Sequence, residues 1–377
     1  MPALSDAEIS ALIEAGRIGA LALDTNVFEP GRNLRSPIVR RLAQFAIRPE
    51  RVLFSDVVAN ELIRHIAESA EETQRALKKH LRAHNLRWYR TAPHDEHKTL
   101  MLDQNPRSFA EAEFERFCEA LGADLLDAAV VPDITRLVLD RYFQDLPPFG
   151  HTEERKREFP DAYALITLEN FASEKDTCIL CISADKGWIE FSEQSDRLVC
   201  VGKTSDAIAL FHDHIKASEV VQKWRDGGIG DHLERVSTAF ASYLDGIPFD
   251  VEATADLYFE AEPYDAVLEF VDPTSLGDPQ ALSVDEDTVT FSVTVDARVK
   301  FTALFTFYVH DSVDREYVAV NTDEYETVSE TTFQLVVTAL KESGETPEFV
   351  DVEIESARLT ADFGHLDVVP DQDPAAY

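Results

Sequence analysis

The stretch Ile18-Gly-Ala-Leu-Ala-Leu23-Asp24 sets the pattern for the first half of the chain, because a short apolar run ends at an acidic residue. A run of this length and composition predicts a buried strand. The pattern returns at Thr177-Cys-Ile-Leu-Cys-Ile182, which is followed by Ser183-Ala-Asp185. Two more apolar runs, 52–54 and 198–201, are also predicted strands, and helical patterns separate all four. Strands that alternate with helices predict a parallel sheet with helices on both faces.

Four acidic residues occupy positions where the carboxyl ends of such strands would meet. Asp24 ends the first strand, and Asp185 follows the third. Glu61 lies one turn into the predicted helix after the second strand, and Asp161 begins a helix after a Pro-Pro loop. Side chains at these strand ends share one crevice in a parallel sheet. Carboxylates gathered there raise one another's pKa unless a cation is bound, and hard oxygen ligands favour Mg²⁺ or Mn²⁺.

The residues around these acids resemble the motifs of PIN-domain nucleases. Leu23-Asp-Thr-Asn-Val-Phe28 is similar to the first motif and Ser55-Asp-Val-Val-Ala-Asn-Glu-Leu62 to the second. Phe159-Pro-Asp-Ala162 is similar to the third motif and Ser183-Ala-Asp-Lys-Gly-Trp188 to the fourth. The motifs follow the family's order over residues of about 20–215. The long spacer resembles a bacterial PIN subgroup with a helical insertion, here about residues 70–150.

The resemblance implies a three-layer α/β/α domain that hydrolyses phosphodiester bonds with Mg²⁺ or Mn²⁺. The substrate would be RNA, most naturally single-stranded, and DNA stays open as an alternative. The implied catalytic residues and metal ligands are Asp24, Asp161 and Asp185, with Glu61 as a ligand directly or through water. The residues implied to orient Asp24 or a bound water are Thr25, Asn26 and Ser183. Candidate phosphate contacts near these motifs are Lys156, Arg157 and Lys186.

The most basic stretch of the chain, residues 75–90, offers a second candidate contact with nucleic acid. Its basic residues include Lys78, Lys79 and Arg82, and the aromatic pair Trp88-Tyr89 lies near its end. Such a surface can hold a single strand through phosphate charge and base stacking. The alternative is a solvated helix face that pairs with nearby glutamates, and the sequence leaves both interpretations open.

Charge divides the chain into two parts. The whole chain has 35 Lys and Arg against 71 Asp and Glu, but residues 231–377 hold only 6 basic and 33 acidic residues. We therefore expect one domain over residues 1–230 and an acidic domain over 231–377. Apolar residues alternate with Thr and Ser over 288–295 and again over 299–309, which predicts an antiparallel sheet with one wet face. The tail at 369–377 is expected to be disordered.

Several classes of protein are excluded or disfavoured. No apolar run reaches about 18 residues, so a membrane span is not expected. The first residues have no basic region followed by an apolar core, so a secretory signal is not expected. Four cysteines are too few for a disulfide scaffold, so the cytoplasm is the expected location. Asn26 stands where a haloacid-dehalogenase-like phosphatase needs its second Asp.

The alternative function is a non-catalytic PIN-like binding or scaffold module. In either case we expect the acidic domain to be a protein-interaction module and the chain to form a homodimer.

Overall fold

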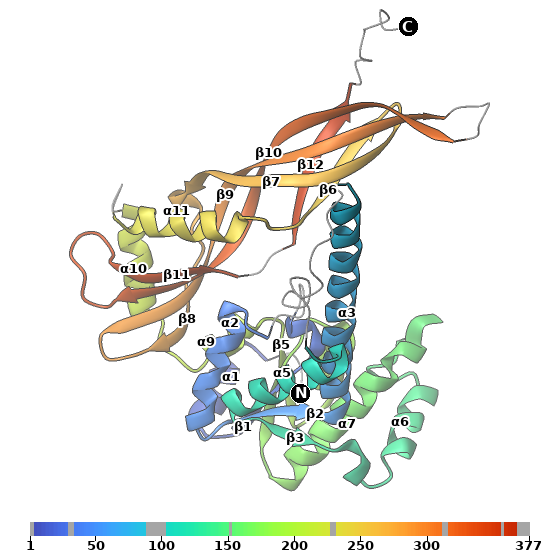
Figure 1. Ribbon diagram of the computed structural model, residues 1–377. Coiled ribbons are helices and arrows are strands. Elements are labelled where there is room, and N and C mark those ends of the chain that lie inside the picture. The colour runs from blue at the N-terminus through green and yellow to red at the C-terminus, as the bar shows by residue number, and fades with distance from the viewer. Residues whose placement is uncertain are drawn as a thin grey trace, which may run out of the picture. The chain divides into compact units, whose positions relative to one another are not determined.

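The computed structural model describes residues 4–28, 34–87, 103–150, 153–226, 231–310, 316–355 and 358–367 of the 377-residue chain. The chain divides into two compact units, Met1–Phe211 and His212–Tyr377 (Figure 1). The expected tail at 369–377 lies outside the described residues. None of the described helices is long and apolar enough to cross a membrane.

The first unit is built on a parallel five-stranded sheet with the strand order β3-β2-β1-β4-β5. All four neighbouring pairs of strands are parallel. Side chains of β1 and β4 are buried along nearly their whole length, as expected for strands with helices on both sides. The predicted α/β sheet is therefore confirmed. Its strands are β1 (Ile18–Leu23), β2 (Arg51–Ser55), β3 (Asp124–Leu126), β4 (Cys178–Ile182) and β5 (Leu198–Val201).

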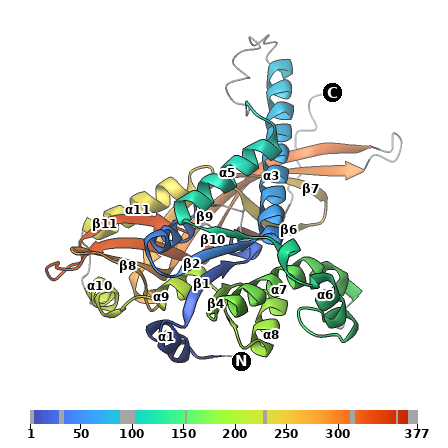
Figure 2. The same cartoon turned by 90° about the horizontal axis from the view of Figure 1, so that it is seen from below.

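Helices connect these strands and pack against the sheet. Helix α7 packs against β2, β4 and β5, and α9 packs against β4 and β5 (Figure 2). The α-helices are α1 (Asp6–Glu14), α2 (Pro37–Arg40), α3 (Asp56–Arg87), α5 (Pro106–Leu121), α6 (Ile134–Phe143), α7 (Phe159–Glu174), α8 (Lys186–Gln194) and α9 (Thr204–Ala209). The described residues of the unit also include the 3₁₀ segments η1 (Thr25–Phe28), η2 (Arg41–Ile47), η3 (Ala128–Val130) and η4 (Glu153–Glu158).

Residues 70–150, expected to form a helical insertion, contribute to the sheet itself. The second half of α3, together with α5 and α6, is helical as expected. However, β3 lies between α5 and α6 and pairs with β2 in the register Leu53↔Asp124. A strand of three residues is shorter than the period-2 pattern needed to recognise it. This part of the chain is therefore not a purely helical insertion.

The order of the strands reverses between β1 and β4. From β1 the chain proceeds to β2 and β3, and then it returns to β4 on the other side of β1. The connections that leave β1 and β4 at their carboxyl ends run in opposite directions, and ligand sites of open α/β sheets lie at such a point. Here the backbone N–H of Asp24 donates to the carbonyl of Ile182 at 3.1 Å, which joins the two strand ends.

The second unit is mainly an antiparallel sheet, as predicted. Its strand order is β11-β10-β9-β7, and β8 also pairs with β9. The two expected strands over 288–309 are one continuous strand, β9, which pairs with β10 along its length. The strands of this sheet are β7 (Tyr258–Asp272), β8 (Gln280–Val284), β9 (Thr288–His310), β10 (Tyr317–Leu340) and β11 (Phe349–Ile354). Two further strands, β6 (Phe249–Ala255) and β12 (Leu359–Leu366), form a separate parallel pair.

The boundary between the units falls earlier than residue 230. Helix α10 (Ile215–Asp226) shares one hydrophobic core with α11 (Asp231–Leu244) and the antiparallel sheet. Its buried Trp224 packs edge-on against Phe349, with the ring centroids 4.9 Å apart. The charge change at residue 231 marks where acidic residues accumulate, whereas the packing of α10 determines where the second unit begins.

This packing predicts that two truncated proteins will behave differently. A fragment of residues 1–230 keeps α10 without the sheet that covers Val220, Val221 and Trp224, so we expect it to self-associate and to bind a hydrophobic dye. A fragment of residues 1–211 lacks α10, and we expect it to be monomeric and to bind less dye. Light scattering coupled to size exclusion, with dye fluorescence, makes the comparison. Identical behaviour of the two fragments would contradict the earlier boundary.

Candidate active site

Asp24 lies buried at the carboxyl end of β1 and accepts hydrogen bonds on both carboxylate oxygens. Its Oδ1 accepts the backbone N–H of Thr25 at 2.6 Å and the Thr25 hydroxyl at 3.3 Å. Its Oδ2 accepts the hydroxyl of Ser183 at 2.6 Å. Burial raises the pKa of Asp24 to about 6, although these hydrogen bonds lower it, and the charge of Asp185 raises it further. The carboxylate is thus firmly positioned but costly to ionise.

The hydroxyl of Ser183 connects the ends of β1 and β4. It donates to Asp24 and accepts the Asn26 Nδ2–H at 3.0 Å and the backbone N–H of Asp185 at 3.0 Å. A hydroxyl has one donor and two acceptor positions, so all three are used. Ser183 is fully buried, and the side-chain oxygen Oδ1 of Asn26 accepts the backbone N–H of Ala184 at 3.5 Å. The three residues predicted to orient Asp24 or a water all lie in this network.

Asp161 lies in the first turn of α7, directly after Pro160. Its Oδ1 accepts the indole N–H of Trp188 at 2.8 Å. Burial raises the pKa of Asp161 to about 7, while this hydrogen bond lowers it and the charges of Asp24, Asp185 and Glu158 raise it. Burial is the main cause of this raised pKa, and the charges of the other two aspartates add to it.

Asp185 caps the amino terminus of α8. Its Oδ1 accepts the backbone N–H groups of Gly187 at 2.7 Å and Trp188 at 3.2 Å. A Cβ atom at Gly187 would lie 2.8 Å from the Cβ of Pro148 and 3.0 Å from that same Asp185 oxygen. Glycine is therefore required for the cap to close against the Pro148 loop. The first turn of α8 fixes Asp185 and also places Trp188 to hold Asp161.

Glu61, the fourth predicted ligand, lies on α3 among basic residues of its own helix. Its Oε1 lies 3.5 Å from an Nη of Arg64 and 3.5 Å from Nε2 of His65. The charges of Asp24, Asp161 and Asp185 thus act on one another, whereas Glu61 lies beside Arg64 and His65 of its own helix. Across the ranges that the structure describes, no three His, Cys, Asp or Glu side chains form a ready group for a metal ion.

Two residues near the aspartates were not assigned to the site from sequence. Glu158 ends η4 and its charge raises the pKa of Asp161. The spacing of three between Glu158 and Asp161 would have indicated this, since residues at i and i+3 of a helix are neighbours. Trp188 is fully buried, as expected for a packing residue, but its indole N–H also holds Asp161. The indole N–H of a buried Trp usually has an acceptor.

The predicted phosphate contacts are exposed. Lys156 and Arg157 lie in η4 with exposed side chains. Lys186 begins α8 and lies 3.2 Å from Glu190. The remaining three are exposed on the second half of α3: Lys78, Lys79 and Arg82. Residues 88–90 of the basic stretch lie outside the described residues.

Part of the first unit matches a known protein family. Residues 21–188 match the family model described as PIN domain. The match lies within the first unit and includes all four predicted acidic residues. This part of the chain is therefore a PIN domain, and PIN domains are generally nucleases. No curated protein and no solved structure matches the chain significantly.

Proposed function

We propose that the PIN domain is a metal-dependent ribonuclease that hydrolyses phosphodiester bonds of single-stranded RNA. The observation that carries the proposal is the convergence of Asp24, Asp161 and Asp185 at the point where the strand order reverses. Burial and mutual repulsion raise the pKa of Asp24 and Asp161 toward neutrality. Strongly shifted carboxylates at such a position are typical of functional sites.

The chemistry of the three side chains fits a divalent cation. Three neighbouring carboxylates repel one another when ionised, and a cation removes that repulsion. Oxygen ligands favour Mg²⁺ and Mn²⁺. The residues that would hold the ion are Asp24, Asp161 and Asp185, with Glu61 acting from α3 through water. A divalent cation bound there supplies an activated water and stabilises the leaving oxygen of a phosphodiester.

The remaining contacts of the chain position these ligands and the substrate. Ser183 and Thr25 fix the Asp24 carboxylate, and Trp188 fixes Asp161. Preorganised ligands of this kind hold a metal more tightly than mobile ones. Exposed basic residues would bind the RNA backbone through its phosphates. We assign this role to Lys156, Arg157 and Lys186 beside the site, and to Lys78, Lys79 and Arg82 on α3.

Cleavage of labelled single-stranded RNA and DNA pools tests the proposal directly. Full-length protein is incubated with Mn²⁺, with Mg²⁺ or with a chelator. We expect cleavage of RNA that requires the metal and disappears when Asp24 and Asp161 are both replaced by Asn. Folded protein that cleaves neither polymer under any condition would overturn the nuclease proposal.

A second candidate function is a non-catalytic binding or scaffold module. The contacts of Glu61 with Arg64 and His65 favour it, because they engage one of the four acids with partners of its own helix. Calorimetric titration with Mn²⁺ separates the two functions. A nuclease binds Mn²⁺ through its aspartates, whereas a scaffold shows no binding that depends on Asp24 and Asp161.

Replacement of Ser183 by Ala should weaken metal binding without unfolding the protein. Asp24 then loses a donor at 2.6 Å, and the bonds from Asn26 and Asp185 lose their shared acceptor. Loss of such an orienting group typically lowers metal affinity or activity by about 10- to 100-fold. The matched control is Ser192→Ala, because Ser192 is also buried but donates to the carbonyl of Trp188. Equal losses in the two variants would show that Ser183 has only a structural role.

A further inference from the structure

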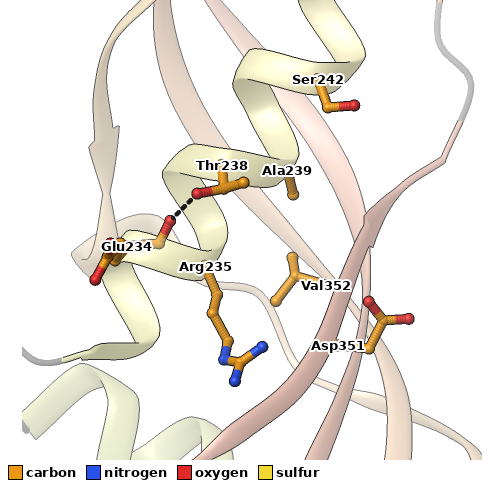
Figure 3. Close-up of a pocket in the computed structure, with 7 residues that line it drawn as sticks. All are labelled: Glu234, Arg235, Thr238, Ala239, Ser242, Asp351 and Val352. Atoms are coloured by element: carbon orange, nitrogen blue, oxygen red, sulfur yellow. Dashed lines mark hydrogen bonds between the residues drawn. The ribbon is translucent and has the colours of Figure 1, made fainter.

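A groove of about 560 Å³ lies in the second unit between α11 and β11 (Figure 3). On the helix side it is lined by residues such as Arg235, Thr238 and Ala239, and on the strand side by Asp351 and Val352. The small side chains of Thr238 and Ala239 leave room beside the strand. The groove is remote in sequence from the PIN domain and is independent of the proposed nuclease activity.

The strand that forms one wall of the groove is the last strand of its sheet. Among the described residues, β11 pairs only with β10. The backbone N–H of Glu355 donates to the backbone carbonyl of Gln334 at 2.8 Å, so these two residues form a hydrogen-bonded pair. Along an antiparallel ladder, hydrogen-bonded pairs alternate with pairs that are not hydrogen-bonded. Val352 and Ile354 occupy the other pairs, so their N–H and C=O groups point away from β10. An outward row of this kind is a template for another strand.

The side of β11 that faces α11 already accepts one hydrogen bond from the helix. Nη1 of Arg235 donates to the carbonyl of Val350 at 3.1 Å. Val350 lies where the register of β11 shifts against β10, between the pairs formed by Phe349 and Asp351. Backbone groups of β11 are therefore accessible from the groove, and a donor can satisfy them there.

Alternation along β11 gives the two faces of the strand different chemistry. Val352 pairs with buried Val337 and packs against the core beneath α11. Asp351 pairs with Thr338 on the opposite face, and its side chain is exposed. A strand added beside β11 would place every second side chain toward α11 and the others beside Asp351. The side chains directed toward α11 must be small and apolar. Basic side chains are favoured at the positions beside Asp351.

The net charge of the second unit also favours a basic strand in the groove. Residues 231–377 hold 33 acidic and only 6 basic residues, and the groove itself is lined by two of these acids, Glu234 and Asp351, against one base, Arg235. An acidic strand would be repelled from Asp351, which also discourages pairing between two copies of this acidic edge. A basic strand is attracted by the whole domain.

We propose that this groove binds an extended segment of a partner protein that adds a strand to β11. The segment alternates small apolar residues, directed toward α11, with Lys or Arg, directed toward Asp351. The backbone of β11 supplies affinity, as in other cases of strand addition. Specificity comes from the alternation, because a register shift of one residue would exchange the two faces.

The test measures binding of fluorescent decapeptides to full-length protein by anisotropy. The probe alternates Lys and Val, and the comparison peptides alternate Glu and Val or contain the same Lys content in a helix-forming Lys/Ala sequence. Val352→Pro removes the outward N–H, and proline is tolerated at such a position of an edge strand. Thr238→Trp fills the groove, and Ala241→Trp is the matched control on α11 outside it.

We expect the Lys/Val peptide to bind at least about tenfold more tightly than either comparison peptide. Val352→Pro and Thr238→Trp should each weaken this binding by about tenfold or more, whereas Ala241→Trp leaves it unchanged. Equal binding of both Lys peptides, or equal binding by all variants, would overturn the proposal by showing only nonspecific charge attraction. A dimer that Val352→Pro converts to a monomer would also overturn it, because the edge would then serve a second copy.

Discussion

Replacement of Asp161 by Asn should abolish RNA cleavage and at the same time stabilise the fold. The pKa of Asp161 is raised to about 7 because the carboxyl is buried and faces Asp24 and Asp185. Its ionised form therefore costs stability at pH 7. Asn retains an oxygen that can accept the indole N–H of Trp188, so the packing is preserved. Without divalent metal, we expect the free energy of unfolding to rise by about 1–3 kcal/mol.

Activity should respond in the opposite direction. Asn carries no charge to hold a divalent cation, so cleavage of RNA should fall by at least about a hundredfold, equivalent to roughly 3 kcal/mol of transition-state stabilisation. Opposite changes in stability and activity are typical of residues retained for function. Denaturant unfolding and RNA cleavage are measured on the same preparations.

Asp196→Asn is the matched control for this experiment. Asp196 is exposed and lies just before β5, at the amino ends of the strands and thus opposite the site. We expect this variant to unfold and to cleave RNA like the wild type. If Asp161→Asn lowers stability instead, then Asp161 is a structural residue and the scaffold function gains support.

The sequence predicted those parts of the molecule in which local pattern and tertiary packing agree. The bounds of β1 and β5 coincide with the predicted strands, because each is a buried apolar run that ends at a change in polarity. The aspartates follow from this, since an acid directly after a buried parallel strand lies at the carboxyl edge of the sheet. Asp24 and Asp185 were placed by this reasoning, and in the structure the Asp24 carboxylate and the backbone N–H of Asp185 both hydrogen-bond to the Ser183 hydroxyl.

The features that sequence could not predict depend on distant partners. Strand β3 is only three residues long, and only its pairing with β2 makes it a strand. The assignment of α10 to the second unit depends on the contact of Trp224 with Phe349, more than 100 residues away. The contacts of Glu61 differ from these two cases, because Arg64 and His65 lie three and four residues further along the same helix and could have been predicted from that spacing.

Stability in the absence of divalent cations should fall as the pH rises from about 5 to 8. The pKa of Asp24 is raised to about 6 and that of Asp161 to about 7, from ordinary values of 3.8. At pH values between the ordinary pKa and the raised pKa values, the folded protein binds more protons than the unfolded chain. The free energy of unfolding therefore declines as the pH increases. The stabilisation is fully present below about pH 4 and is lost as the pH passes the folded pKa values.

A divalent cation should reverse this dependence. It binds the ionised carboxylates, so it competes with protons and stabilises the folded state most where those carboxylates are deprotonated. We expect Mn²⁺ to raise the melting temperature by several degrees at pH 8 and to have almost no effect at pH 5. Melting curves at pH 5, 6, 7 and 8, with chelator and with Mn²⁺, measure both dependences.

The double variant Asp24→Asn/Asp161→Asn isolates the contribution of the site from that of the other acidic residues. The chain carries 71 Asp and Glu, and their general repulsion also changes with pH. This background is nearly the same in wild type and variant, so the difference between their profiles reports on the two buried aspartates. We expect that difference to grow between pH 5 and 8 in chelator, and the response to Mn²⁺ to be lost in the variant. Parallel profiles with equal responses to Mn²⁺ would show that the cation binds elsewhere, and the proposed metal site would then be untenable.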